Sequence, residues 1–219
     1  MRGGEVPTAT TDLWPDVHEE RRELLGFLET LSAEQWNAPT LCDRWRVRDV
    51  VGHIAGSTET TMPRALLAMM ASGFCINRVI EKDGRRRGSA PIPVLVTSYR
   101  TAVPRTTHPP GQSPMSMLAD IIIHQIDIRR PLGRSRFVPE RRMRLVASYL
   151  YPHKFFVGHK LAADLQLRAT DSDWSAGEGP EVLGPIEALA LTLSGRFIAL
   201  DELHGDGAML LRDRAGAHT

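Results

Sequence analysis

DIIIHQIDIRR, at residues 120–130 and closed by Pro-Leu-Gly at residues 131–133, is the stretch that decides how we expect the chain to fold. Its isoleucines point in almost every direction around a helix, which is typical of a helix buried on most sides. Three polar residues interrupt this apolar surface. Asp120, His124 and Asp127 are spaced i, i+4 and i+7, so they lie on one face of the helix.

This polar face permits two interpretations. Burying a carboxylate and an imidazole costs several kcal/mol unless each finds a counter-charge or a metal ion. In the first interpretation, Asp120 and His124 form a local ion pair. In the second they are two ligands of a metal ion, and His53, from a separate predicted helix, is the third. Because D-x-x-x-H is a weak pattern, spacing alone favours the ion pair.

The composition narrows the class of protein. The 219 residues suffice for one large domain, or for one domain with a small appendix. Lys and Arg total 27 against 26 Asp and Glu, a net charge of +1, so charge gives no reason to expect nucleic acid or an acidic membrane as partner. No apolar run reaches the ~18 residues that span a bilayer, and no signal-peptide core is present. We therefore expect a cytoplasmic protein.

Apolar periodicity predicts a helical region over residues 12–158, after a disordered lead-in at residues 1–11. Ser32 to Gln35 is typical of a capping box. The small residues Gly52 and Gly56 would let another helix or a ligand come close to His53. The helices expected from periodicity cover residues 12–31, 46–56, 58–72 (with a break at Pro63), 94–102, 120–130 and 139–151.

Two segments are expected to be loops that border the site. Residues 82–93, KDGRRRGSAPIP, are basic and punctuated by Gly and Pro, so Arg85, Arg86 and Arg87 are interpreted as solvated. Residues 104–114 form the second loop. Within 58–72 we expect the following residues in the core: Met62, Leu66, Leu67, Met69 and Met70. Trp45 and Trp174 are likewise expected to be core anchors.

The pattern changes after Lys160. Short alternating segments predict strands at residues 165–169, 174–176 and 181–183, followed by a helix over 185–195. A short helix at residues 198–203, a turn at 205–207 and a last apolar run at 209–211 complete this region, which we assign as a small α/β cap over residues 159–213. The expected fold class is thus mainly α, a four-helix bundle with a small C-terminal α/β domain.

The two cysteines, Cys42 and Cys75, form no CxxC motif and predict no disulfide framework. A cysteine nucleophile has no support in the sequence beyond the presence of these residues. The sequence also contains no GxSxG, HExxH or P-loop motif.

Three stretches resemble a known family. Trp36 and residues 41–56, LCDRWRVRDVVGHIAG, are similar to the opening motif of the mycothiol-dependent maleylpyruvate isomerase family, in the DinB/YfiT-like superfamily. Residues 120–133 resemble its second motif, and residues 165–196 resemble its C-terminal domain. The resemblance implies an actinobacterial protein with a DinB-like four-helix bundle that binds a divalent metal, usually zinc.

The resemblance also implies a ligand set, namely His53, Asp120 and His124. The usual carboxylate of the family is glutamate, and Asp120 is one methylene shorter. Asp127 would either orient an imidazole or anchor the helix end. Arg196, from the cap, is the candidate catalytic residue, as a cation for an acidic substrate or for the sugar of the thiol. A surface arginine at a helix end is the alternative.

The implied activity is that of a thiol transferase or isomerase. Metal coordination would make the thiol of mycothiol a thiolate at neutral pH, which attacks a small electrophilic substrate. Two other functions stay open: a non-catalytic DinB-like metal- or ligand-binding protein, and a metal-dependent hydrolase with water in the open position. The expected partners are a small-molecule substrate and a low-molecular-weight thiol, and the chain is expected to be a monomer or a homodimer.

Overall fold

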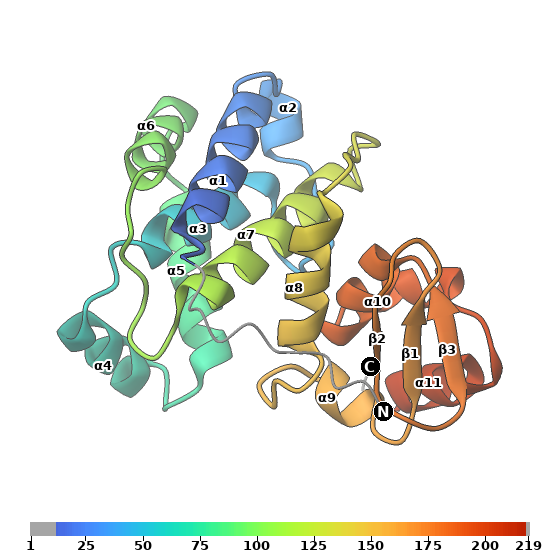
Figure 1. Cartoon of the computed structure of the whole chain (residues 1–219). Helices are drawn as coiled ribbons and strands as arrows, with labels where there is room; N and C mark the ends of the chain where they lie inside the picture. Colours follow the sequence, from blue (N-terminus) through green and yellow to red (C-terminus); the bar gives the residue numbers. More distant parts are fainter. Residues whose placement is uncertain (1–11, 218–219) are drawn as a thin grey trace.

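Helix α7, Pro114–Arg129, lies at the centre of the helical bundle (Figure 1). It packs against α1, Trp14–Leu28, against α3, Val47–Ser57, and against α8, Glu140–Leu150. Every residue from Ile121 to Arg129 is buried, so the predicted helix buried on most sides is confirmed. Asp120, in the N-terminal half of the helix, keeps part of its side chain accessible and lines the pocket described below.

The computed structural model describes residues 12–217, and the predicted disordered lead-in at residues 1–11 lies outside them. The predicted capping box is confirmed, because Gln35 N donates to Ser32 Oγ and Ser32 N donates to Gln35 Oε1. The other helices of the bundle region are α2 (Ala33–Trp36), α4 (Met62–Ala71), α5 (Ile76–Gly88), α6 (Ile92–Ala102) and α9 (Gly158–Leu161).

The prediction of a loop over residues 82–93 is wrong, because most of this segment belongs to α5. Its glycines do not break the helix; they let α5 lie directly on α3. A Cβ at Gly88 would lie 2.8 Å from Asp49 Cα, and one at Gly84 would lie 2.9 Å from the Trp45 ring. On the facing helix, a Cβ at Gly52 would lie 2.8 Å from Gly88 N. The expectation that Gly52 admits a second helix is thus confirmed.

The arginines of this segment are also only partly solvated. Arg85 and Arg86 are exposed, as expected. Arg87 is not, because it turns inward and forms ion pairs with Asp83 and Glu59.

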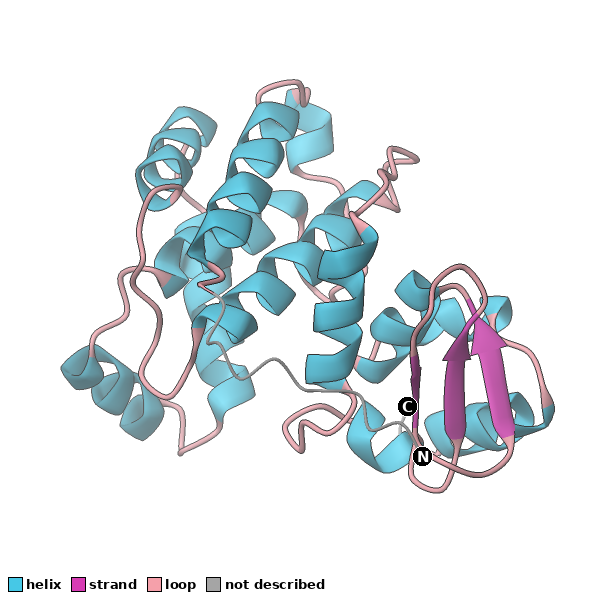
Figure 2. Ribbon diagram, viewed as in Figure 1, coloured by secondary structure: helices cyan, strands magenta, loops and turns pink. Residues whose placement is uncertain are grey.

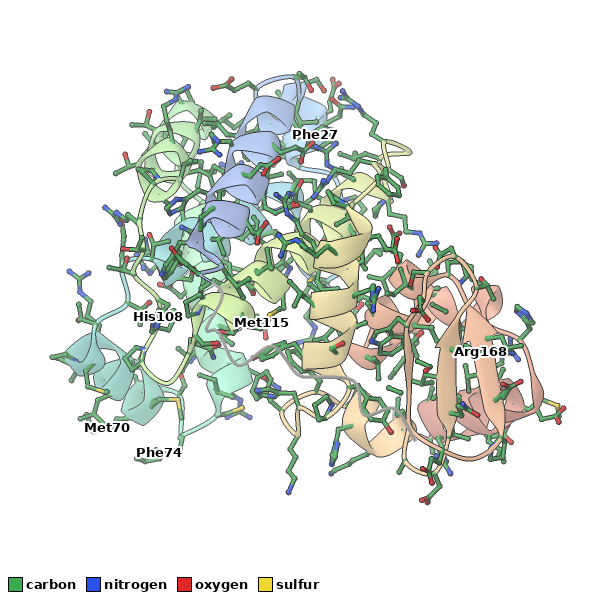
Figure 3. The ribbon with its side chains drawn as sticks, in the orientation of Figure 1. Phe27, Met70, Phe74, His108, Met115 and Arg168 are labelled. Atoms are coloured by element: carbon green, nitrogen blue, oxygen red, sulfur yellow. The ribbon has the colours of Figure 1, made fainter. Side chains whose placement is uncertain are left out.

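Helix α4 corrects a second prediction. Its apolar residues were expected in the core, but none of its residues is buried. Met62 is 65% exposed and Leu67 is 62% exposed. Figure 3 shows Met70, together with the nearby Phe74, at the edge of the molecule. The helix forms as predicted, but it stands apart from the bundle (Figure 1).

The C-terminal part holds the strands, coloured magenta in Figure 2. The sheet has the order β2-β1-β3, with β2 antiparallel and β3 parallel to β1, and Leu167 paired with Ala176 and Val182. Its elements are β1 (Gln166–Ala169), β2 (Ser175–Ala176), β3 (Glu181–Gly184), α10 (Ile186–Leu193), the 3-10 helix η1 (Phe197–Glu202) and α11 (Asp206–Gly216).

The predicted fold class, mainly α with a small C-terminal α/β part, is therefore confirmed, whereas the boundary at residues 158/159 stays a prediction. The turn expected at residues 205–207 is instead the start of α11. None of the helices in the described part of the chain combines the length and the apolar character needed to cross a bilayer.

A buried ion-pair network joins α1 to α8. Arg142 donates from Nε to Asp16 Oδ1 at 2.9 Å and from Nη1 to Glu20 Oε1 at 2.9 Å. Glu20 is fully buried, and it also accepts a hydrogen bond from Gln125 of α7 at 2.7 Å. Because each charge has its partner, the network joins α1, α7 and α8 without leaving a lone buried charge.

We predict that Arg142→Ala destabilises the protein by about 1.5–3 kcal/mol, because it removes the buried one of the two arginine partners of Asp16 and of Glu20 and leaves them only Arg141 and Arg136. Urea denaturation followed by circular dichroism measures this. Arg144→Ala is the matched control on the same helix, since Arg144 is exposed and lies 3.8 Å from Glu140. Its cost should stay below about 1 kcal/mol. Equal losses in the two variants would contradict the assigned role of the network.

Candidate metal centre

Helices α3 and α7 bring His53, Asp120 and His124 together. His53 Nε2 lies 3.5 Å from Asp120 Oδ1, and His124 Nε2 lies 3.4 Å from the same oxygen. The two imidazole rings are edge to face, with centroids 5.2 Å apart. One ligand atom of each residue lies within 4.8 Å of the others. The three residues that the resemblance implies as ligands thus converge, and the shorter side chain of Asp120 reaches both histidines.

Asp127 fixes the orientation of the His124 ring. Because a carboxylate only accepts hydrogen bonds, the 2.8 Å contact assigns a donated hydrogen to His124 Nδ1, with Asp127 Oδ2 as the acceptor. This leaves His124 Nε2 directed toward Asp120. Asp127 is fully buried, so of the two roles predicted for it the structure favours that of orienting an imidazole.

Arg196 holds Asp127 in turn. Its Nε donates to Asp127 Oδ1 at 3.0 Å and its Nη2 donates to Oδ2 at 2.7 Å, a two-point contact between guanidinium and carboxylate. Arg196 also lines the pocket beside the site. It is therefore neither a plain surface arginine nor a free cation, because its charge is paired with a buried carboxylate.

The charges of the site reinforce one another. Burial alone would raise the pKa of Asp120, but the facing charges of His124 and His53 hold that pKa well below its usual range. Burial likewise opposes the charge on His124, and Asp120 outweighs it, so the pKa of His124 lies well above its usual value. The ion pair and the metal site, which are the two interpretations of the sequence, thus involve the same residues. In the ion pair His124 carries a proton, and in the metal site a metal ion takes the place of that proton.

The donor set fits a divalent cation. Asp120 Oδ1 faces both histidines, whereas Oδ2 is buried and has no hydrogen-bond partner among the described residues, so the carboxylate retains an unused acceptor. Two imidazole nitrogens and one carboxylate oxygen are ligands typical of zinc, with further positions left for a substrate. Whether these residues bind a metal stays a prediction.

A second group of donors, Cys42, His124 and Asp127, fits a cation less well, although its ligand atoms also lie within 4.8 Å of one another. A cation is already present there, because Arg196 Nη2 lies 3.2 Å from Cys42 Sγ as well as 2.7 Å from Asp127 Oδ2. In addition, His124 Nδ1 is already hydrogen-bonded to Asp127. The site at His53, Asp120 and His124 is therefore the better candidate.

Sequence reasoning missed Cys42. Its thiol donates to Asp127 Oδ2 at 3.0 Å, and the preceding Leu41 N donates to Asp127 O at 3.1 Å. The loop before α3 is thereby tied to α7. The available signal was that Cys42 lies in the same motif as Trp45 and His53. Trp45 is buried, as expected of a core anchor, and its ring also contacts His53 at a centroid distance of 5.1 Å.

A pocket of about 1670 Å³ opens beside the three residues. Its walls come from α3, α4, α5, α7 and α8, with further residues from the segments 109–113 and 194–198. Of the two segments expected to border the site, residues 104–114 do so as a loop, and residues 82–93 do so through Asp83, Arg86 and Arg87 of a helix.

Fold and site together define a helical-bundle protein whose bundle holds a nitrogen- and oxygen-donor site at the edge of a large pocket. Residues 17–108 match the family described as the mycothiol maleylpyruvate isomerase N-terminal domain. The predicted resemblance to that family is therefore confirmed. The matched range includes His53 and ends before Asp120.

Two solved structures share the fold. One is a mycothiol-dependent maleylpyruvate isomerase, with 13% sequence identity and a TM-score of 0.63. The other is a histidine-to-alanine mutant of the mycothiol-dependent maleylpyruvate isomerase, with 12% identity and a TM-score of 0.62. Each comparison covers 90% of this chain and 92% of the other. Among curated proteins, none matches this chain in sequence.

Asp127→Asn should weaken zinc binding by about 10- to 100-fold, because an amide no longer fixes the His124 ring or its donating Nδ1. Competition with a chromophoric chelator measures the affinity. Asp173→Asn, at an exposed position outside the site, is the control and should bind zinc as the wild type does. An unchanged affinity in Asp127→Asn would show that Asp127 has only a structural role.

Proposed function

We propose that the protein is a metal-dependent enzyme that uses a low-molecular-weight thiol, mycothiol, as an isomerase or transferase acting on an electrophilic small molecule. The convergence of His53, Asp120 and His124 at the wall of the pocket carries this proposal. The family match over residues 17–108 and the fold shared with mycothiol-dependent maleylpyruvate isomerase support it. A cytoplasmic location, an actinobacterial source and a monomer or homodimer stay predictions.

The residues that would hold the metal are His53 through Nε2, His124 through Nε2 and Asp120 through its carboxylate. When bound, a divalent cation such as zinc would lower the pKa of a thiol placed against it, so that the sulfur is a thiolate at neutral pH. The pocket leaves room for such a thiol beside the three residues.

The chain's own residues prepare the site. Asp127 accepts from His124 Nδ1 and so keeps His124 Nε2 directed at the site, while Arg196 keeps Asp127 ionised. Burial alone would raise the pKa of Asp127, but the Arg196 charge outweighs it and the pKa lies well below the usual range. Asp127 therefore stays an acceptor at every physiological pH. Trp45 packs against both imidazoles and excludes water from that side.

The reaction class follows from the chemistry of a thiolate. With a conjugated double bond, the sulfur bonds to one carbon and the electron pair of the double bond moves along the conjugated system. Rotation about the resulting single bond and loss of the thiol give the isomer. With a substrate that carries a leaving group, the sulfur bonds to the carbon, the bond to the leaving group breaks, and that group departs with the electron pair; the product is a thioether and the protein is a transferase.

We predict that His53→Ala and His124→Ala each lose at least tenfold in bound zinc, because each removes one of three ligands. Elemental analysis of the purified proteins measures this. Thiol-dependent turnover of a chromogenic electrophile should fall in parallel. His204→Ala, at an exposed position in the C-terminal part, is the matched control and should retain both properties.

Equal zinc content in the wild type and both variants would contradict the proposed site. Turnover that does not require a thiol would instead identify a metal-dependent hydrolase. Zinc binding without any turnover would identify a metal- or ligand-binding protein.

A further inference from the structure

The pocket beside the candidate metal centre has to hold the thiol as well as the electrophile, and it is larger than a typical site for one small molecule. Its volume is about 1670 Å³, whereas small-molecule sites typically measure roughly 300–1,000 Å³. The metal-site residues His53, Asp120 and His124 occupy only one part of its wall. The pocket therefore has a second region, away from these residues, whose surface indicates what it accepts.

One wall of this second region is an apolar helix pair. On α4, Ala65, Ala68 and Met69 line the pocket at helical spacing, and they are only half-buried because no other part of the described chain packs on them. On α5, Val79 and Ile80 continue the same wall. A helix face of this composition is usually covered by a core, and here it faces open space instead.

Another part of the pocket wall carries an aromatic cluster. Tyr149 and Phe156 have ring centroids 6.4 Å apart, and Phe155 and Phe156 have centroids 5.4 Å apart. All three residues line the pocket, and Phe155 is 57% exposed. Two apolar surfaces thus border the same pocket, and water covers each of them poorly, because exposed apolar surface has an unfavourable free energy of hydration.

Several charged side chains of the pocket are paired with one another. Arg87 forms ion pairs with Glu59 and Asp83, and Arg105 also pairs with Glu59. Arg196 is paired with Asp127. These side chains need no charged ligand, whereas the helix pair and the aromatic cluster leave apolar surface exposed to the pocket.

We propose that the acceptor substrate carries an elongated apolar tail. The tail lies between the α4–α5 wall and the aromatic cluster of Tyr149, Phe155 and Phe156, and the electrophilic carbon lies at His53, Asp120 and His124. The position of the electrophilic carbon rests on the proposed function, whereas the tail site is inferred from the residues that line the pocket alone. The two are therefore tested separately.

The tail site is tested without any reaction. N-phenyl-1-naphthylamine, a neutral apolar fluorophore, should bind the wild-type protein, and decanol should displace it at far lower concentration than butanol. Ala68→Trp fills the pocket from α4 and should weaken binding of the fluorophore at least tenfold. Leu67→Trp is the matched control, because Leu67 is 62% exposed on the outer face of the same helix. It should bind as the wild type does.

Ala65→Trp serves as the second filling variant, and circular dichroism with urea denaturation checks that each variant folds. Wild-type affinity in both folded filling variants, or no fluorophore binding by the wild type, would overturn the proposal. His124→Ala should keep fluorophore binding, since this residue belongs to the metal centre and not to the tail site.

A second measurement uses N-alkylmaleimides with mycothiol and the zinc-loaded protein. The thiol sulfur bonds to one ring carbon and its proton ends on the neighbouring carbon, so no further reactant is needed. The value of kcat/KM should rise with the length of the alkyl chain, by up to about fourfold for each buried methylene. The rise should be lost in Ala68→Trp and kept in Leu67→Trp.

The outcomes distinguish the two proposals. Fluorophore binding without turnover of any maleimide would contradict the proposed function and leave the tail site standing. Turnover that is independent of chain length, with no fluorophore binding, would contradict the tail site alone.

Discussion

Polar side chains on a buried helix must be partnered by other segments, and this constraint on α7 organises the structure. Gln125 is bonded to Glu20 of α1, and Asp120 lies beside His53 of α3. Asp127 accepts hydrogen bonds from Arg196 of the C-terminal part and from the Cys42 thiol of the loop before α3. Helices and loops far apart in the sequence are thus fixed around one helix, and the candidate metal centre lies where their contacts meet.

The convergence of His53, Asp120 and His124 could be predicted in part. Helical spacing alone placed Asp120 and His124 on one face. No local sequence pattern connects these two residues to His53. Only the resemblance to the family's motifs predicts that the three lie together. The partners of Asp127 could not be derived from the sequence, because Cys42 and Arg196 reach it through tertiary packing that carries no periodic signal. A glutamate at position 120 was not needed, since the aspartate already reaches both rings.

The two errors in the fold have one physical cause each. The pattern predicts a loop at Gly84 and Gly88, but both lie within α5, where only glycine leaves room for Trp45 and for Asp49 of α3. Local propensity was overridden by the close approach of two backbones. In α4 the apolar pattern correctly predicts a helix but wrongly predicts that it is buried. The helix borders a pocket and not the core. Periodicity reports that a face is apolar and not what covers it.

X-ray absorption spectroscopy at the zinc edge, on zinc-loaded protein without added thiol, tests the central claim most directly. The account predicts two imidazole nitrogens and carboxylate oxygen at roughly 2.0–2.2 Å, from His53, His124 and Asp120, with no sulfur ligand. A sulfur scatterer at about 2.3 Å would place the metal on Cys42 instead and contradict the assignment. A spectrum without scattering from imidazole rings would also contradict the assignment.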